Sequence, residues 1–154
     1  MVASVSIKRT KKVDLKALPK HPASVKVGFP AGEASQGNIM KAIYNEFGTR
    51  GGASGGGWGG PIPERPFMRN SVQNNKGKYK TYLTTSALSV LTGKQTLLVV
   101  LNRLGILAQG HIQEEIGNLS DPPNSPVTIA LKGSSKPLID TGAMRQSVTW
   151  KIAR

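Results

Sequence analysis

The sequence predicts an α+β fold in which a small antiparallel sheet of three to four strands packs against a long helix and shorter helices. Apolar and polar residues alternate over residues 25–29, 127–131 and 148–152, which is the period of strands with one face on the core. Apolar residues recur every three or four positions over residues 94–117, which is the period of one amphipathic helix. A chain of 154 residues is long enough to bury a core of ordinary size, so a single domain over residues 1–154 is expected.

The N-terminal region adds two weaker elements. Val5 and Ile7 are expected to form an edge strand, and a short helix is expected over residues 13–18. The alternating segment of residues 25–29 then gives the first of the three half-buried strands, because only one of its faces is apolar.

Two helices are expected before the long one. Ile39, Ile43 and Phe47 stand four residues apart, which predicts a helix over residues 38–47. A helical region over residues 67–91 carries apolar residues at mixed helical spacing, and Gly77 is expected to interrupt it because glycine is a poor helix former.

The long helix has a clear stripe and recognisable ends. Thr92 and Gln95 have the spacing of a capping box for its first turn, and Gly117 supplies a stop. Gly105 and Gly110 each cost about 1 kcal/mol against alanine inside a helix, so they are expected to allow close packing or a slight bend. The apolar stripe is expected to lie on the sheet, and its members are Leu97, Leu101, Leu104, Ala108, Ile112 and Ile116.

A flexible glycine-rich loop is expected at residues 50–63. Residues 51–60 contain seven glycines and Trp58, and Pro61 and Pro63 follow. Glycine gives maximal backbone entropy and buries nothing, which predicts mobility in the isolated subunit. Two interpretations stay open: an arm that orders against a neighbouring subunit with Trp58 as its anchor, or an inert insertion.

Charge is the second strong signal. The chain has 21 Lys and Arg against 8 Asp and Glu, a formal net charge of +13. Basic blocks attract polyanions through a sequence-independent Coulomb interaction, although they also occur as solvated surface or as docking surface for an acidic protein. The residues proposed to face DNA lie in two such blocks: Lys8, Arg9, Lys11 and Lys12, then Lys76, Lys78 and Lys80.

The composition argues against several functional classes. Cysteine is absent and there are only two histidines, so neither a disulfide framework nor a Cys- or His-based metal site is expected, and no cofactor is expected. The first residues lack the apolar stretch of a signal peptide and no apolar run approaches bilayer length, which predicts a soluble protein made and used in a cytoplasm. The closest approach to a phosphate-binding loop, residues 88–95, lacks its first glycine and its Ser or Thr.

The segment around Asp140 offers the sharpest enzymatic alternative. Residues 138–143 resemble the active-site turn of retroviral aspartic proteases, which pair two such carboxyl groups across a dimer. Only twelve residues follow Gly142, too few to build the rest of that fold. The structural interpretation is that Asp140 or Thr141 caps a short turn over residues 143–146 before a strand that begins at Ser147.

Glu46 and Arg65 are the other candidates for chemistry. Glu46 could be a general base, but the sequence offers no convincing partner set. An ion pair between Glu46 and Arg65, or a contact of either with the next subunit, is expected instead. Pro66 fits the first turn of a helix because it lacks an N–H, and Phe67 is expected to enter the core.

Three segments in order carry a family resemblance. They are Asn45-Glu46-Phe47-Gly48-Thr49, then residues 63–69 (Pro-Glu-Arg-Pro-Phe-Met-Arg), then Lys132-Gly133-Ser134 leading to residues 137–142 (Pro-Leu-Ile-Asp-Thr-Gly). Together they resemble the tail-component and virion-morphogenesis family of tailed bacteriophages, over roughly residues 25–152. The motif or subunit-interface residues are Asn45, Glu46, Gly48, Trp58, Arg65, Pro66, Phe67, Asp140, Thr141 and Gly142.

The resemblance implies a structural protein rather than an enzyme. It implies a homo-oligomeric ring, a hexamer by analogy with the family, at the neck or upper end of the tail, in contact with other neck and tail proteins and transiently with DNA in the channel. The expected location is the virion, and the host cytoplasm during assembly. The alternative from another class is a small basic protein that binds nucleic acid non-specifically, which an aromatic content of only 5% disfavours because single-strand binders stack bases on aromatic side chains.

Overall fold

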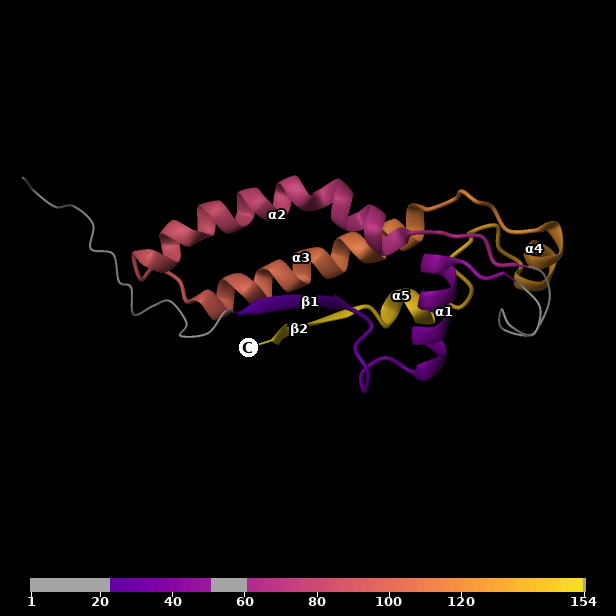
Figure 1. Cartoon of the computed structure of the whole chain (residues 1–154), viewed down its shortest axis with the longest axis horizontal. Coiled ribbons are helices and arrows are strands. Elements are labelled where there is room, and N and C mark those ends of the chain that lie inside the picture. The colour runs from indigo at the N-terminus through magenta and orange to yellow at the C-terminus, as the bar shows by residue number, and fades with distance from the viewer. Residues whose placement is uncertain (1–22, 51–60, 154) are drawn as a thin grey trace, which may run out of the picture.

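The computed structural model describes residues 23–50 and 61–153, which contain five helices and two strands (Figure 1). In chain order they are β1 (Ser24–Gly28), α1 (Gln36–Phe47), α2 (Phe67–Leu91), α3 (Leu97–Asn118), α4 (Pro126–Lys132), α5 (Ala143–Gln146) and β2 (Thr149–Ala153). The expected α+β class is confirmed. The predicted edge strand at Val5 and Ile7, the helix over residues 13–18 and the glycine segment over residues 51–60 lie outside the described residues.

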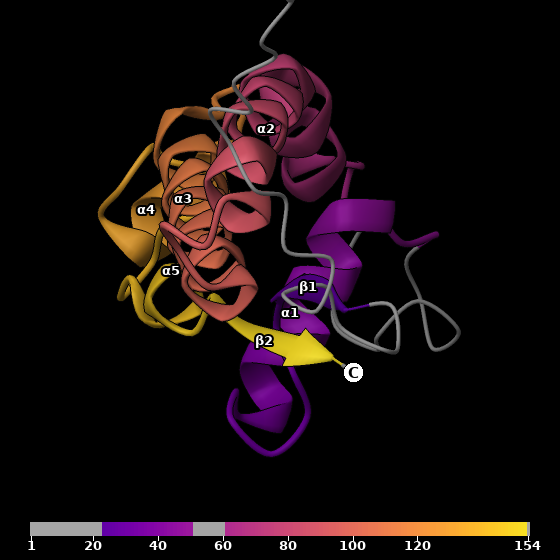
Figure 2. The ribbon, with the colours of Figure 1, turned by 90° about the vertical axis from the view of Figure 1, so that its left-hand side faces the viewer.

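The molecule is layered around α3. β1 and β2 pair antiparallel, with Val25 opposite Ile152 and Val27 opposite Trp150. α3 packs against both strands on one side and against α2 on the other, and α2 and α3 run antiparallel along the long axis (Figures 1 and 2). The prediction that the long helix lies on the sheet is therefore confirmed. α1, α4 and α5 gather at the end where α2 begins and α3 ends (Figure 1).

The prediction of three to four strands is wrong for the described part of the chain, where the sheet has two. The segment predicted as a strand over residues 127–131 is the helix α4. The Ser125 side chain caps its start by accepting the N–H of Thr128, Pro126 takes the first helical position, and Gly133 ends it in a left-handed conformation. Val127 and Leu131 are also four residues apart, so the same pattern fits a helix, and the end signals decide between the two.

Both ends of the α2–α3 connection differ in detail from the prediction. Thr96, not Thr92, caps α3: its hydroxyl accepts the N–H of Val99 at 3.3 Å. Thr92 instead ends α2, where its hydroxyl donates to the carbonyl of Leu88 at 2.8 Å. The expected interruption at Gly77 is also wrong, because α2 runs continuously from Phe67 to Leu91. The packing of α2 on α3 outweighs the propensity cost of one exposed glycine.

The core lies where α1, α2, α3 and the C-terminal segment meet. Phe67 is fully buried, as predicted, and its ring meets that of Phe29 edge-on with centroids 6.3 Å apart. Val148, which begins the approach to β2, is fully buried against the same cluster. The remaining buried members of the cluster are Ala42, Ile112, Ile116, Leu119, Leu138 and Met144.

Gly105 is where α3 and the sheet come closest. A Cβ atom at this position would lie 2.6 Å from Cε3 and 2.7 Å from Cγ of Trp150, well inside van der Waals contact. The other interior glycine of α3, Gly110, is exposed and has nothing within 4 Å. The expectation of close packing therefore holds for Gly105, which lets the Trp150 ring approach the backbone of α3.

A polar pair joins α2 to α3 away from the core. The hydroxyl of Tyr79 lies 3.0 Å from Nδ1 of His111. Burial lowers the pKa of His111 from its ordinary value, nearby Lys78 lowers it further, and Glu114 opposes this with a smaller effect. Burial also raises the pKa of Tyr79, so its hydroxyl keeps the proton that it can donate to a neutral His111.

This pair predicts a pH dependence. Because the folded-state pKa of His111 is depressed below 6.5, the unfolded chain binds the proton first, and folding stability should fall as pH decreases below about 6.5. His111→Gln, which cannot titrate, should lose less stability than the wild type between pH 7.5 and pH 5. Urea unfolding of both proteins at the two pH values measures this difference. An equal loss in both would contradict the prediction, since all other titrating groups are shared.

Candidate functional site

The three segments that carry the family resemblance meet at one end of the fold. They border a cleft of about 910 Å³ between α1, the segment of residues 61–65, the loop of residues 123–125, α4 and residues 137–144. We call it the Arg65 cleft. Its charged lining residues are Lys41, Arg65, Lys132 and Asp140.

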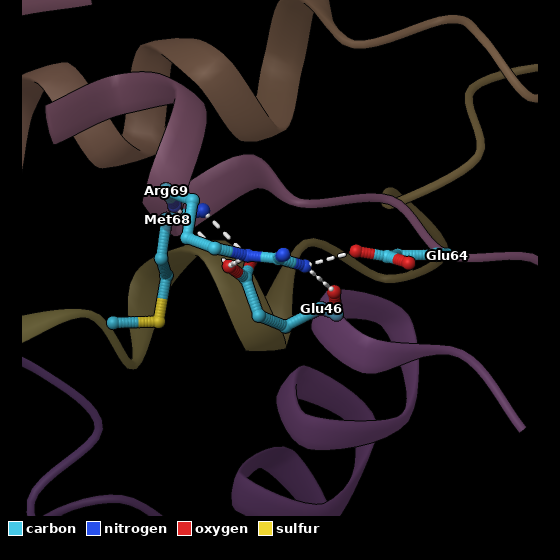
Figure 3. A network of polar contacts seen from close by, with 4 residues as sticks. All are labelled: Glu46, Glu64, Met68 and Arg69. Atoms are coloured by element: carbon cyan, nitrogen blue, oxygen red, sulfur yellow. Dashed lines mark hydrogen bonds and ion pairs between the residues drawn. The ribbon is translucent and has the colours of Figure 1, made fainter. Parts of the chain in front are cut away.

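Glu46 joins the first segment to the second. Its carboxylate is buried and accepts the N–H of Met68 at 2.9 Å and the N–H of Arg69 at 3.2 Å, which are backbone donors in the first turn of α2 (Figure 3). Pro66, at the N-cap of α2, offers no side-chain cap, so Glu46 of α1 serves as the cap from another helix. A carboxylate there also complements the positive end of the helix dipole.

The expected ion pair between Glu46 and Arg65 is wrong, because Arg69 takes that place. Nε of Arg69 donates to Glu46 at 3.0 Å, and its Nη2 donates to the backbone carbonyl of Glu46 and to the carboxylate of Glu64 (Figure 3). The hydrogen bonds to the carboxylates of Glu64 and, second, of Glu46 raise the pKa of Arg69. The guanidinium also lies 5.4 Å from the centre of the Phe47 ring.

Arg65 donates hydrogen bonds from its guanidinium to neutral acceptors. Its side chain donates to the carbonyls of Pro122 at 2.8 Å and Pro123 at 3.0 Å, and to the side-chain oxygens of Asn45 and Asn124. It is 4% exposed, and burial lowers its pKa from the ordinary value. Among the described residues no carboxylate forms an ion pair with it. The loop of residues 122–124 is thus held against α1 by a buried cation whose acceptors within the described residues are all neutral.

Backbone bonds complete the junction of the first two segments. Arg65 donates its N–H to the carbonyl of Asn45 at 2.7 Å, and Thr49 and Ile62 exchange two hydrogen bonds. Gly48 has a φ of +70°, and a Cβ there would lie 3.0 Å from the carbonyl oxygen of Ile62. Only glycine suits both the conformation and the space.

The third segment closes the opposite wall. Lys132 donates from Nζ to the carbonyls of Lys136 and Pro137 at 3.0 and 3.3 Å. Burial lowers the pKa of Lys132, Asp140 raises it and Arg65 lowers it, so both charges act on Lys132 across the cleft. Asn124 also donates to the carbonyl of Lys136, which links this wall to Arg65.

The turn at Asp140 is capped by its neighbour. The Thr141 hydroxyl accepts the N–H of Ala143 at 3.3 Å, whereas Asp140 is exposed and accepts no hydrogen bond from any described residue. Of the two predicted caps, Thr141 is therefore confirmed. Gly142 stands at the N-cap of α5 with a φ of +79°, and Ser147, expected to begin the last strand, ends α5 two residues before β2.

Thr141→Val should lower the free energy of unfolding by about 0.5–1 kcal/mol, because the variant keeps the shape and loses the acceptor. Asp140→Ala should leave it within about 0.5 kcal/mol of the wild type, as exposed substitutions usually do. Urea unfolding curves of the two variants measure both values. A larger cost for Asp140→Ala than for Thr141→Val would reverse the assignment of the cap.

Large apolar side chains stand exposed around the cleft. Leu131 is 83% exposed, Val127 is 69% exposed and Phe47 is 66% exposed, the three highest values among the large apolar side chains described. Val127 lines the cleft itself, and Leu131 lies one helical turn further along α4. Phe47 lies beside Ile62, which also lines the cleft. Exposed apolar side chains gathered at one end of a fold favour a contact with another molecule.

The structure separates the remaining predicted residues. Lys76, Lys78 and Lys80 are exposed on α2, but Lys76 and Lys80, four residues apart, share a face whereas Lys78 lies near enough to His111 to lower its pKa. Trp58 and the basic block of Lys8, Arg9, Lys11 and Lys12 lie outside the described residues. Lys41 and Lys132, which line the cleft together with Arg65, were not predicted as site residues. Only their charge could have drawn attention to them, since no spacing links the three.

Comparison of the chain with protein-family models, with curated proteins and with solved structures finds no match. Across residues 23–50 and 61–153, no three His, Asp or Glu side chains come together as a metal site requires. None of the helices in that same part of the chain combines the length and apolarity needed to cross a bilayer.

Proposed function

We propose that this chain is a structural subunit of a tailed-phage virion, which forms a ring at the neck or upper tail and completes the tail or joins it to the head. The observation that carries the proposal is the exposed apolar surface of Phe47, Val127 and Leu131 around the Arg65 cleft. A subunit that remains alone in water gains nothing from such a surface, whereas an assembling subunit buries it. The order of the three segments at this end supports the phage assignment by resemblance.

In this proposal the segment residues shape a contact surface and do not catalyse a reaction. Glu46 and Arg65 form hydrogen bonds with backbone groups of neighbouring segments, and these bonds fix the position of both cleft walls. Asp140, the residue of the protease-like turn, is exposed. A pepstatin-sensitive peptidase activity that disappears in Asp140→Ala would overturn the proposal.

Oligomeric state and location test the proposal directly. The full chain should form a closed cyclic oligomer, a hexamer by analogy with the resembled family, either alone or on a neck partner. Light scattering of the purified protein and electron microscopy of virions carrying a labelled copy measure this. Leu131→Asp, at the most exposed large apolar position among the described residues, should fold as the wild type does and weaken attachment to a neck or tail partner, so that fewer virions carry the protein. A protein that is monomeric at every concentration and absent from particles would refute the ring.

A second candidate, non-specific nucleic-acid binding, is favoured by the exposed Lys76 and Lys80 on one face of α2 and by the net charge of +13. In a ring through which DNA passes, such contacts should be weak and salt-sensitive, because each neutralised phosphate releases counter-ions and a tight grip would stall the moving DNA. Titration of duplex DNA at low and physiological salt distinguishes the two candidates. Tight binding at physiological salt that falls in Lys76→Gln/Lys80→Gln would favour the nucleic-acid binder.

A further inference from the structure

The Arg65 cleft combines uncompensated positive charge with an apolar wall. Its lining contains three cationic side chains, those of Lys41, Arg65 and Lys132, against one carboxylate, that of Asp140. Arg65 is 4% exposed and all four of its acceptors are neutral carbonyl or amide oxygens. Burying a cation without a counter-ion is costly, and an anion entering the cleft would offset part of that cost.

The lining also determines how an occupant can be recognised. Four prolines line the cleft and supply no N–H donors, so an added β-strand cannot be held by a regular ladder of backbone hydrogen bonds there. Recognition must depend on side chains, namely the three cations and the apolar groups that include Val127 and Ile62. The apolar surface continues beyond the cleft along α4 to Leu131. An elongated occupant covers this surface, whereas a compact small molecule in the cleft does not reach it.

The charge of the chain argues against a second copy as the occupant. The protein carries a formal charge of +13, and its first 22 residues hold six Lys and Arg against Asp14 alone. A like-charged segment entering a cationic cleft would be repelled. The complementary partner is therefore a different, acidic protein.

We propose that the Arg65 cleft binds an extended acidic segment of another protein, with a carboxylate facing Arg65, Lys41 and Lys132 and apolar side chains on Val127 and Leu131. This inference deepens the proposed assembly function and rests on it for the identity of the partner as a virion protein. The chemistry of the cleft can be measured on the isolated full chain.

The test uses a fluorescein-labelled octapeptide of alternating glutamate and leucine, with a control peptide that has glutamine in place of each glutamate. Fluorescence anisotropy at low and physiological ionic strength should show binding of the acidic peptide only, weaker at the higher ionic strength. Lys41→Gln should weaken binding by about three- to fivefold, as expected for one partly exposed charge pair. Lys76→Gln makes the same charge change on α2, outside the cleft, and should alter binding by less than about twofold.

A second variant tests the apolar wall. Val127 is 69% exposed and stands in the first turn of α4, where an aspartate is compatible with the helix, so Val127→Asp should fold and should weaken binding more than about tenfold. Circular dichroism and urea unfolding confirm folding of each variant. Equal binding of the glutamine peptide, or wild-type affinity in both Lys41→Gln and Val127→Asp, would overturn the proposal. Displacement of the peptide by an oligonucleotide whose own binding depends on Lys41 would also overturn it, since the cleft would then be a polyanion site.

The peptide assay and the assembly assay fail independently. Cleft-dependent binding of the acidic peptide by a protein that forms no ring and enters no virion would support the cleft and refute the assembly role. A ring found in virions whose subunit does not bind the peptide would support the assembly role and refute the proposal for the cleft.

Discussion

Glu46→Ala is expected to lower the free energy of unfolding by about 2–4 kcal/mol, because two backbone N–H groups at the start of α2 lose a charged acceptor in a buried position. No side chain of α2 can replace the lost cap, since Pro66 stands at the N-cap. The cost should include weaker attachment of α1 to α2, and the Arg65 cleft depends on both. Urea unfolding monitored by circular dichroism measures the loss.

Two variants isolate the contribution of the cap. Glu64→Ala removes the other carboxylate that pairs with Arg69, but Glu64 is 53% exposed, so unfolding should remain close to that of the wild type. Glu46→Gln keeps the shape and one acceptor oxygen and should lie between the wild type and Glu46→Ala. Similar losses for Glu64→Ala and Glu46→Ala would show that the ion pair with Arg69, and not the capping of α2, accounts for the effect.

The parts of the fold that the sequence predicted correctly have either a long apolar pattern or a clear difference between an apolar and a polar face. The stripe of α3 extends over six turns, so an error in one position does not change the outcome. β1 and β2 pair with each other, and the alternation in residues 25–29 and 148–152 reflects a real difference between their faces. The segment of residues 127–131 is short: Val127, Ile129 and Leu131 alternate as in a strand, but Val127 and Leu131 are also about one helical turn apart. Ser125, Pro126 and Gly133 resolve the ambiguity and were not considered as helix ends.

The sequence named Asn45, Glu46 and Arg65 as candidate site residues but did not predict which groups each of them contacts. The expected ion pair between Glu46 and Arg65 does not form, because Glu46 binds Arg69 and the start of α2 while Arg65 binds Asn45 and the loop of residues 122–124. Which of two nearby arginines meets a carboxylate depends on the direction in which α2 leaves Pro66. That direction is set by packing of Phe67 in the core, and no spacing in the sequence reveals it.

Gly105→Ala is expected to destabilise the protein, whereas Gly110→Ala, five residues away in the same helix, should stabilise it. Alanine is favoured over glycine inside a helix by about 1 kcal/mol, and both substitutions gain that amount. At Gly110 nothing lies within 4 Å, so the gain remains. At Gly105 the new methyl group overlaps the Trp150 ring at Cγ and Cε3. Overpacking of this kind costs about 1–3 kcal/mol, and more where backbone must move.

Rotation of the ring about its Cβ–Cγ bond cannot relieve the overlap, because the overlap includes Cγ itself, and the backbone of Trp150 is held in register opposite Val27. Either α3 moves from the sheet or β2 shifts, and both disturb the layer beneath α3. Thermal and urea unfolding should therefore show changes in the free energy of unfolding of opposite sign for the two variants. The unfolding transition of Gly105→Ala, followed by Trp fluorescence, should also be less cooperative. If Trp150→Ala is introduced together with Gly105→Ala, the cost of the alanine should disappear and its helical gain should return. Destabilisation by Gly105→Ala that persists without the Trp150 ring would place its cause in the helix itself rather than in the contact between α3 and β2.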